Sequence, residues 1–185
     1  MMSGKMSLSD YRTGPFNPGA TAAKKALWFY MSALFFKPRL FPVYGLKRGL
    51  LRLCGARFGG GLFIKPGANI KYPWKLEAGE NVWIGEEAWI DNTAEVRIGS
   101  NVCISQGAML LTGNHDYKRA SFDLMARPIT IEDGVWIGAR ALICPGVTVA
   151  SHSVVTAGSV LSDDTEPYGI YRGNPAVKVR SRHIR

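Results

Sequence analysis

The sequence predicts an all-β solenoid, a parallel β-helix, and three observations support this. Branched aliphatic residues recur at every sixth position over two long stretches of the chain. Inside many of these units a small or turn-forming residue follows the aliphatic one, as in Ile84-Gly85 and Ile137-Gly138, and a second small or branched residue lies two positions earlier. A six-residue period fits neither a helix nor an isolated strand, whereas short strands joined by tight corners repeat in this way.

Residues 1–60 are expected to form a basic, partly helical cap before the coil. They hold ten Lys or Arg residues, Arg39 among them, against the single acid Asp10, and so account for the whole net charge of +9. The apolar run ALWFYMSALFF (26–36) is shorter than the roughly 20 residues of a membrane-spanning helix, and the amphipathic run GLKRGLLRLCG follows it. We expect these side chains to cover the open end of the solenoid. A second role stays open, because basic and aromatic residues within 24–53 also suit peripheral contact with an anionic membrane.

The coil is expected over residues 61–165. Stacked coils place equivalent side chains above one another, which suits branched aliphatic residues inside and Gly, Asn or Asp at the corners. The later row of inward positions is uninterrupted: Ile131, Ile137, Ile143, Val149, Val155 and Leu161. The earlier row contains one slip of two residues, after the sixth of its positions: Ile64, Ile70, Leu76, Val82, Ala88, Ala94, then Ile98, Ile104 and Leu110.

The segment 111–128 separates the two rows. It reads LTGNHDYKRASFDLMARP, which is polar, charged and without a period, so it has to leave the coil as a protruding loop. Long loops of this kind usually carry function, and this one holds His115, one of three histidines in the chain. After the coil, residues 166–185 are expected to form a C-terminal tail.

Several motifs resemble those of a known family. They are IKYPWKLEAGENVWIGEEAWIDN (70–92), NVCISQGAMLLTGNHDY (101–117), GVWIGARALICPGVTVASHSVVTAGSV (134–160) and EPYGIYRGNPAVKV (166–179). Together they make the chain similar to the hexapeptide-repeat, left-handed β-helix acyltransferases, and closest to the colanic-acid biosynthesis acetyltransferases. The resemblance runs from about residue 34 to the C-terminus. Left-handedness of the coil is implied by the resemblance alone, since parallel β crossovers are normally right-handed.

The resemblance implies transfer of an acetyl group from acetyl-CoA to a sugar hydroxyl. His115 matches the catalytic histidine of the family and would act as general base, because a neutral imidazole can take the proton of the attacking hydroxyl. Asn114 and Asp116 would orient the loop or the acceptor, although turn chemistry explains them as well. Direct transfer is expected, since no serine lies in a nucleophile elbow and no cysteine has a base beside it in a motif.

The residues that would contact acetyl-CoA and the acceptor are assigned from the positions that match the family's motifs. On the donor side the matching residues would line the cleft, bond the pantetheine arm through backbone N–H groups or a hydroxyl, and meet the CoA phosphates; they are Trp136, Ala139, Ala157, Ser162, Lys178 and Arg180. On the acceptor side Asp91 and Asn92 would bond sugar hydroxyls, with Trp83 and Trp89 nearby. A solvated coil corner would carry such acids and aromatics in any case.

The resemblance also implies partners and an assembly. The acceptor would be a sugar or a lipid-linked saccharide of an exopolysaccharide or surface-glycan precursor. Members of the family are homotrimers whose active sites lie between neighbouring subunits, so His115 of one subunit would face the coil of another. Nucleic acid is not expected as a partner, because no nucleic-acid-binding module accompanies the basic charge.

Two other functions stay open. The first keeps acetyl transfer but changes the acceptor to a free small sugar or another small metabolite; serine is disfavoured, because the helical domain that precedes the coil in serine acetyltransferases is missing. The second is a structural or metal-binding β-helix, as in γ-type carbonic anhydrases. Those proteins need three zinc-binding histidines on adjacent coils, which His152 and His183 do not supply, so no metal is expected.

Composition agrees with a single globular unit. A chain of 185 residues with 46% hydrophobic content is large enough to bury a core. Its three cysteines are Cys54, Cys103 and Cys144, an odd number without metal-binding spacing, which fits a reducing compartment. No cleavable signal peptide is visible. We therefore expect a cytoplasmic protein, with the inner membrane face as an alternative place for it.

Overall fold

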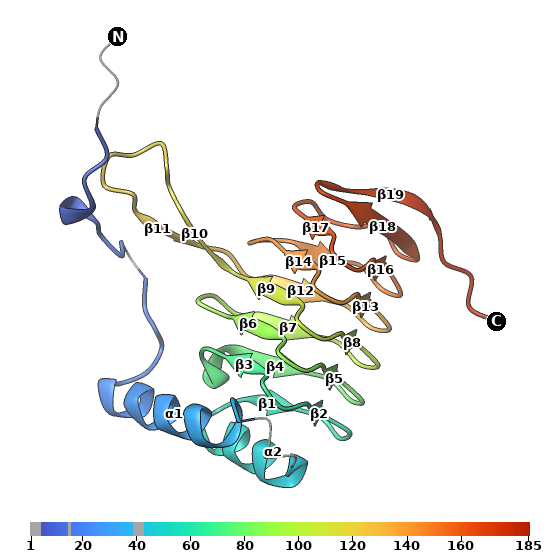
Figure 1. Cartoon of the computed structure of the whole chain (residues 1–185), viewed down its shortest axis with the longest axis horizontal. Helices are drawn as coiled ribbons and strands as arrows, with labels where there is room; N and C mark the ends of the chain where they lie inside the picture. Colours follow the sequence, from blue (N-terminus) through green and yellow to red (C-terminus); the bar gives the residue numbers. More distant parts are fainter. Residues whose placement is uncertain (1–4, 15, 39–42) are drawn as a thin grey trace.

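The computed structural model describes residues 5–14, 16–38 and 43–185, so Arg39 lies outside the described residues. Two helices, α1 (Ala22–Phe35) and α2 (Tyr44–Leu53), lie at one end of a three-sided parallel solenoid (Figure 1). Two short 3-10 turns, η1 (Leu8–Asp10) and η2 (Pro73–Lys75), complete the helical structure of the described residues. The expected β-solenoid with a helical cap is confirmed.

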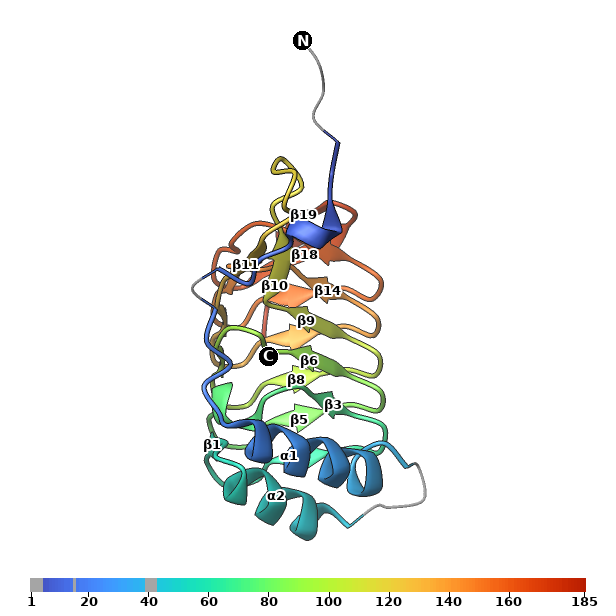
Figure 2. The same ribbon diagram turned by 90° about the vertical axis from the view of Figure 1, so that its left-hand side faces the viewer.

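Three parallel sheets form the sides of the solenoid. The first face contains β2 (Phe63–Ile64), β5 (Trp83–Ile84), β8 (Cys103–Ile104), β13 (Trp136–Ile137), β16 (Val154–Val155), β18 (Gly169–Gly173) and β19 (Ala176–Ser181). The second face contains β3 (Asn69–Ile70), β6 (Trp89–Asp91), β9 (Met109–Leu111), β14 (Leu142–Ile143) and β17 (Val160–Leu161). The third face contains β1 (Arg57–Phe58), β4 (Leu76–Ala78), β7 (Val96–Ile98), β12 (Ile129–Ile131) and β15 (Thr148–Val149). Figure 2 looks onto the second face.

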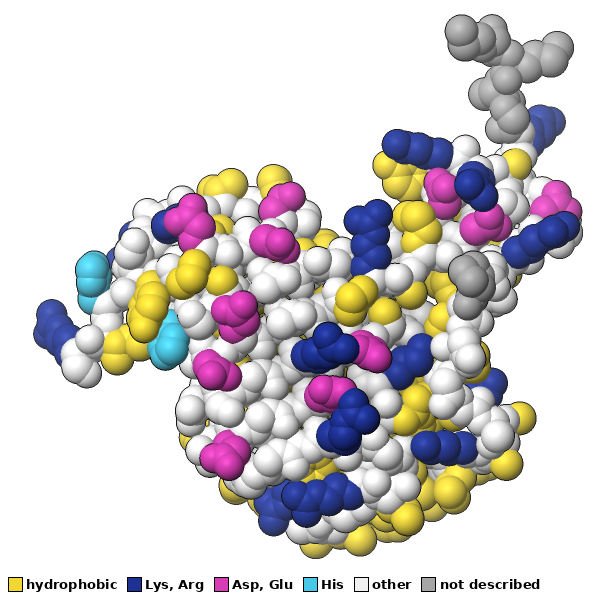
Figure 3. All heavy atoms as spheres, turned by 180° about the vertical axis from the view of Figure 1, so that it is seen from behind, with side chains coloured by type: hydrophobic (Ala, Val, Ile, Leu, Met, Phe, Trp, Pro, Cys, Tyr) yellow, Lys and Arg dark blue, Asp and Glu magenta, His cyan; other side chains and the backbone are white. Residues whose placement is uncertain are grey.

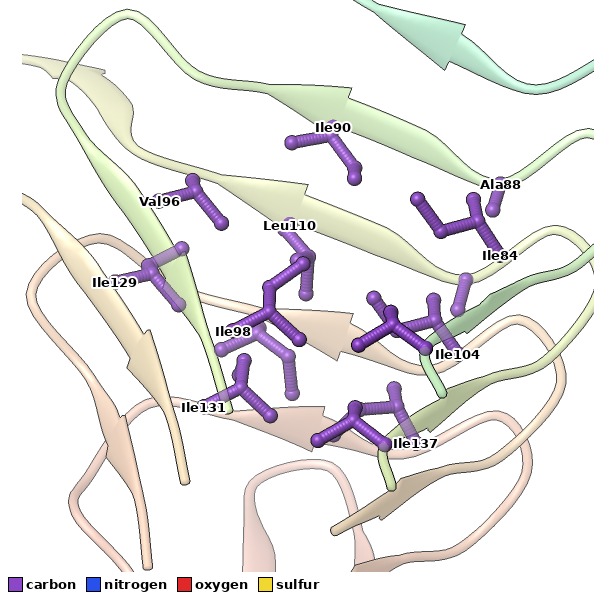
Figure 4. Packing of buried hydrophobic residues seen from close by; sticks show 14 of the residues in the cluster. Ile84, Ala88, Ile90, Val96, Ile98, Ile104, Leu110, Ile129, Ile131 and Ile137 are labelled. Carbon is purple, nitrogen blue, oxygen red and sulfur yellow. The ribbon is translucent and has the colours of Figure 1, made fainter. Parts of the chain in front are cut away.

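The core is a set of vertical stacks of aliphatic side chains. Ile84 aligns with Ile104, and Ile104 with Ile137, so the three side chains lie above one another inside the coil (Figure 4). The residue two positions before each inward aliphatic residue also points into the core. Val82 and Ile84 are such a pair, and both are buried. This follows from the alternation of side chains along a strand, since residues two apart point to the same side.

The register differs from the expected earlier row. Ile64 aligns with Ile84 and Ile84 with Ile104, so these coils take twenty residues, whereas Ile137 aligns with Val155 and that coil takes eighteen. The two extra residues therefore recur in each early coil, at the corner between the second and third faces, instead of once. An error of two residues is hard to detect from sequence, because positions two apart share a face.

The N-terminal helices close one end of the coil. The Trp28 indole of α1 is buried and donates a hydrogen bond to the Ile70 carbonyl over 2.8 Å. Phe36 packs edge-on against the Trp28 ring at 5.1 Å, and its carbonyl accepts a bond from the Gly67 amide. Leu51 of α2 is fully buried in the same cluster. These contacts cover the apolar interior that the first coil would otherwise expose.

The boundaries of the coil lie outside 61–165 at both ends. Strand β1, before residue 61, already pairs with β4. Beyond residue 165, β18 pairs in parallel with β16, and β19 returns antiparallel to β18. The last twenty residues thus extend the first face and cover the far end of the core. Among the described helices, none has both the length and the apolar character needed to cross a bilayer.

Candidate active site

The protruding loop leaves the coil at the corner between the second and third faces. Its two sides form an antiparallel ribbon of β10 (Gly113–His115) and β11 (Leu124–Ala126), in which His115 pairs with Leu124. Thr112 fixes the base of the ribbon: its buried hydroxyl donates to the Asp91 carbonyl at 2.9 Å and accepts from the Ala94 amide at 2.8 Å. The ribbon therefore rises from a rigid corner and carries His115 away from the coil (Figure 1).

His115 is half-buried, and its ring is held on two sides. The ring stacks in parallel on Phe122 at a centroid distance of 4.3 Å, and Nδ1 lies 3.1 Å from the Phe122 carbonyl oxygen. A carbonyl oxygen can only accept, so in neutral His115 the proton resides on Nδ1 and the lone pair on Nε2. The imidazole is thus held in the tautomer that can take a proton through Nε2.

An N-terminal strap, residues 5–14 and 16–18, completes the surroundings of His115. The Ser7 amide donates to the Ala120 carbonyl at 2.9 Å, and the Leu124 amide donates to the Arg12 carbonyl at 3.3 Å. Between these two contacts the ring of Tyr11 lies 5.7 Å from the ring of His115.

Two side chains of the first coil anchor the lower part of the strap. The Trp74 indole donates to the Pro18 carbonyl at 2.6 Å, and the Lys75 ammonium donates to the Asn17 carbonyl at 2.9 Å. Burial lowers the pKa of Lys75, while the nearby Glu95 carboxylate opposes that shift. Sequence reasoning missed Tyr11 and Phe122, because neither lies in a repeat or beside His115 in the chain.

Asn114 and Asp116 stabilise the ribbon around His115. The Asn114 side-chain oxygen accepts a bond from the His115 amide at 2.8 Å. The Asp116 carboxylate accepts from the Lys118 amide at 3.1 Å and pairs with the Arg119 guanidinium at 3.2 Å. The structure thus gives both residues a role in shaping the turn. Their expected contact with an acceptor stays a prediction.

Asp91 and Asn92 lie at the same corner as the ribbon, one coil below it. Asp91 is half-buried and pairs with the Lys71 ammonium over 2.8 Å. Asn92 is fully buried, and its amide makes two bonds to the Tyr72 backbone, accepting from N–H at 2.8 Å and donating to the carbonyl at 2.6 Å. The structure therefore brings Asp91 near the base of the His115 ribbon. The Asn92 side chain stabilises the corner through these two bonds. Because it is fully buried, this geometry disfavours direct contact with a sugar.

Ala139 and Ala157 lie at a different corner, between the first and second faces, and Trp136 lies beside them on β13 of the first face. The half-exposed Trp136 indole donates to the Ser105 hydroxyl at 2.9 Å. Ala139 and Ala157 occupy equivalent positions on neighbouring coils, linked by a bond from the Gly158 amide to the Ala139 carbonyl. Within the described part of the chain, neither the Ala139 nor the Ala157 backbone N–H has a hydrogen-bond partner. Two free donors beside small side chains suit an extended chain that carries carbonyl groups.

The remaining expected donor residues lie toward the C-terminal end of the coil. Ser162 is exposed after β17, and its hydroxyl donates to the neighbouring Asp163 carboxylate at 2.9 Å. On β19, the Lys178 ammonium bonds the Glu166 carboxylate at 2.5 Å, and this hydrogen bond raises the pKa of Lys178. Arg180 on the same strand is exposed. A phosphate reaching Lys178 would have to share it with Glu166.

The expected site residues therefore fall on two edges of one chain. The corner between the second and third faces holds one group: Asp91, Asn92, Asn114, His115, Asp116 and also Ser162, which follows β17. Ala139 and Ala157 lie at the corner between the first and second faces, and Trp136 lies beside them on β13 of the first face. The second face, with outward Trp89, separates the two groups (Figure 2). Across residues 5–14, 16–38 and 43–185, no group of three or more potential metal-binding side chains gathers.

The chain is similar in sequence to a family model and to proteins named as acetyltransferases. The family described as bacterial transferase hexapeptide (six repeats) matches residues 128–163. The chain is 36% identical over 164 residues to the Escherichia coli (strain K12) protein named "Putative colanic acid biosynthesis acetyltransferase WcaF", which covers 89% of this chain and 90% of that protein. It is 31% identical over 137 residues to the galactoside O-acetyltransferase of the same strain, covering 72% of this chain and 68% of that one.

Solved structures agree with this likeness. The hexapeptide-repeat containing acetyltransferase VCA0836 of Vibrio cholerae O1 biovar eltor, complexed with acetyl coenzyme A, superimposes with a TM-score of 0.81 at 26% identity, covering 97% of this chain and 100% of that one. A galactoside acetyltransferase in complex with coenzyme A gives a TM-score of 0.80 at 25% identity, covering 97% and 92%.

Proposed function

This chain belongs to the hexapeptide-repeat acetyltransferase family, and from that premise we propose that it moves an acetyl group from acetyl-CoA to a sugar hydroxyl of a surface-glycan precursor. Membership in the family is shown by the relative that is 36% identical over 89% of the chain. It makes the protein an acetyl-CoA-dependent acetyltransferase and implies a left-handed coil, so the family resemblance seen in the sequence is confirmed. The acceptor, the general base and the assembly are the proposal.

The observation that carries the mechanism is the tautomer of His115. In the proposed reaction Nε2 takes the proton of the acceptor hydroxyl as that oxygen attacks the thioester carbonyl. The new carbon–oxygen bond forms, the carbon–sulfur bond breaks, and the imidazolium returns the proton to the departing thiolate of CoA. The Phe122 carbonyl supports these steps, because it accepts a hydrogen bond from Nδ1–H. It thereby stabilises the positive imidazolium while Nε2 holds the transferred proton. No covalent acyl-enzyme is needed.

The donor is proposed to lie along the edge that carries Ala139 and Ala157. Their free backbone N–H groups would bond the carbonyl groups of the pantetheine arm, and the small side chains would let the arm lie against the coil. Trp136 would flank the arm at this edge. Lys178 and Arg180 would meet the phosphates nearer the C-terminal end through charge-assisted bonds. Ser162 follows β17 at the corner between the second and third faces, so its contact with the arm would come from a neighbouring subunit.

The two edges are proposed to meet between subunits of a homotrimer. In one chain the His115 corner and the Ala139 corner are separated by the second face, so the general base and the donor arm do not share a site there. Packing about a threefold axis would bring the His115 corner of one subunit to the donor edge of the next. The half-exposed Trp89 and Trp136 are apolar surfaces that such packing would cover.

The acceptor is proposed to be a sugar of a surface-glycan precursor, free or attached to a lipid carrier. The relative named for colanic acid biosynthesis favours this class. Asp91, beside the loop base, supplies a carboxylate that can bond sugar hydroxyls. A free small sugar is the second candidate, since the chain is also 31% identical to a galactoside O-acetyltransferase. The cytoplasmic location expected from the sequence remains part of the proposal.

Release of CoA from acetyl-CoA by purified protein tests the proposal. The acceptors are free galactosides, oligosaccharides of surface glycans and lipid-linked saccharides, with wild type beside His115→Ala. We expect acceptor-dependent release that falls by about 10²-fold or more in His115→Ala. His183→Ala is the control, because His183 is an exposed histidine outside both edges. Full activity in His115→Ala would refute the assigned base, and activity with free galactosides alone would favour the second acceptor class.

A further inference from the structure

Helix α1 presents an unusual surface to solvent. After Lys25, every residue from Ala26 to Phe35 is apolar or serine. Trp28 and Ser32 face the coil and are buried. The opposite side carries Leu27, Tyr30 and Leu34, which are 53%, 65% and 64% exposed. A helix that is apolar all round normally has both sides covered. Here the coil covers one side, and none of the described residues covers Leu27, Tyr30 and Leu34 on the other.

Helix α2 extends the apolar surface at the same end of the coil. Leu46 and Leu53 lie seven residues apart, about two turns, so they share one side of the helix, and they are 40% and 73% exposed. The two helices lie side by side in both ribbon views (Figures 1 and 2). Figure 3 shows hydrophobic side chains gathered along this end of the molecule, with Lys and Arg side chains among them. We call the exposed sides of α1 and α2 the basal surface.

The two helices of the basal surface carry charge of a single sign, and Asp91, which lines a hollow beside α1, is paired with Lys71. No Asp or Glu occurs between Asp10 and Glu77 in the sequence, while Lys37 and Arg52 are exposed and Lys25 and Arg48 are half-exposed. Lys47 does not contribute to this rim, because it is fully buried beside the Phe36 ring, and burial lowers its pKa. Exposed apolar side chains on two helices that carry cations and no acids match an anionic lipid surface.

We propose that the basal surface docks on an anionic phospholipid membrane, with α1 lying in the headgroup region. Helix α1 has 14 residues. It is therefore about 21 Å long, which is too short to span the roughly 30 Å hydrocarbon layer, so it lies on the membrane instead of crossing it. A second copy of the chain is a poorer occupant, because a symmetric contact would bring one basic rim against another. The inference stands apart from the acetyl-transfer reaction.

Co-sedimentation of the full-length protein with vesicles tests the inference directly. Two vesicle compositions are compared: phosphatidylcholine with phosphatidylglycerol, and phosphatidylcholine alone. We expect wild type to sediment with the anionic vesicles, to remain in solution with the neutral ones, and to be released as the salt concentration rises. Replacing the exposed ammonium in Lys37→Gln should weaken binding by about fivefold. Absence of binding to anionic vesicles by the folded protein would overturn the inference.

Substitutions locate the contact. Leu34→Gln and Leu53→Gln should each weaken binding to anionic vesicles by about tenfold, since each removes one apolar side chain from the lipid. Val177→Gln is the matched control, because Val177 is 59% exposed on β19 at the other end of the coil. Circular dichroism confirms that all three variants fold.

Two results would refute the membrane contact. One is equal binding by Leu34→Gln, Leu53→Gln and Val177→Gln. The other is a change in the mass of the particle in sedimentation velocity for Leu34→Gln but not for Val177→Gln, which would assign the basal surface to a contact between copies of the chain. Neither readout depends on catalysis, so failure here is distinguishable from failure of the proposed reaction.

Discussion

At the scale of single residues, the orientation of His115, the proposed base, depends on one backbone carbonyl. Phe122 has a positive φ of 51°, a conformation that is uncommon for a non-glycine residue. In this conformation Phe122 both stacks its ring on His115 and directs its carbonyl oxygen at Nδ1. One residue thereby fixes the plane and the tautomer of the imidazole. The sequence reveals the histidine, but it gives no sign of the residue that orients it.

Tyr11 gives a prediction at the residue scale. Its ring lies 5.7 Å from the His115 ring and comes from the N-terminal strap. Tyr11→Ala removes that contact and loosens the imidazole, so we expect kcat to fall by about tenfold while the KM for acetyl-CoA stays unchanged. Tyr11→Phe keeps the ring and should keep the activity. Steady-state kinetics on both variants checks this.

The control for Tyr11 is Tyr117→Ala, in the same loop. Tyr117 is 75% exposed, and no ring contact between it and His115 is found among the described residues. An equal loss of activity in Tyr117→Ala would show that any loss of aromatic bulk disturbs the loop. Unchanged kcat in Tyr11→Ala would show that the strap does not position His115.

At the scale of elements, the corners explain why a small residue follows the inward aliphatic one. A Cβ added at Gly85 would lie 2.5 Å from the Gln106 amide nitrogen, and one added at Gly138 would lie 2.5 Å from the Ala157 amide nitrogen. Neighbouring coils are hydrogen-bonded at this spacing, so they leave no room for a side chain there. The Ile-Gly units visible in the sequence are therefore a direct consequence of coil stacking.

The corner between the first and second faces gives a prediction at the element scale. Gln106 and Ala157 are equivalent positions on different coils, so the corner accepts a long side chain without a change of backbone. Ala157→Gln should leave the thermal unfolding midpoint unchanged and raise the KM for acetyl-CoA by about tenfold, because the new side chain would cover the free N–H groups. Titration of acetyl-CoA in the steady-state assay measures this.

Gln106→Ala is the converse substitution at this corner. Gln106 follows β8 and Ala157 follows β16, so the two positions are equivalent but lie two coils apart on the first face. Gln106→Ala therefore acts away from the free Ala157 N–H. We expect it to leave the KM for acetyl-CoA unaltered. A KM that rises in Gln106→Ala but not in Ala157→Gln would place the donor lower on this edge than proposed.

At the scale of the whole molecule, the separation of the two edges predicts complementation between subunits that are each impaired in a different half of the site. If the site forms between subunits, a mixed trimer of His115→Ala and Ala157→Gln chains contains some sites with both wild-type halves. Each mixed trimer contains one such site out of three, so the co-expressed variants should show about a third of the wild-type activity at limiting acetyl-CoA. Activity of the mixed assemblies, purified through two different tags, is the measurement.

The outcome of complementation also separates assembly from catalysis. A trimer without regained activity would place the whole site in one chain, and it would contradict the proposed meeting of the two edges. A monomer in sedimentation velocity would contradict the assembly itself. The three solenoids of a trimer would also present their basal surfaces at equivalent positions, which would strengthen docking on a membrane through multivalent contact.

The repeating parts of this protein follow from local rules that are visible in its sequence. Each coil obeys the same local rules, with aliphatic pairs inside and small residues at the corners, so the period alone specifies the solenoid and leaves the loop 111–128 as the exception. The family motifs also single out His115 as the candidate base. The register of the early coils was misplaced, because a slip of two residues keeps every side chain on its own face.

The surroundings of the site depend on contacts between segments that are far apart in the sequence. Tyr11 and Phe122 meet at His115 through the strap and a bend of the loop, and these contacts follow no period. Asn92 looked available for a sugar in the sequence, yet its amide is buried and bound to the Tyr72 backbone. The free N–H groups of Ala139 and Ala157 also depend on which neighbouring coil supplies an acceptor. Such contacts join residues far apart in the chain, and three-dimensional packing, not local sequence, selects their partners.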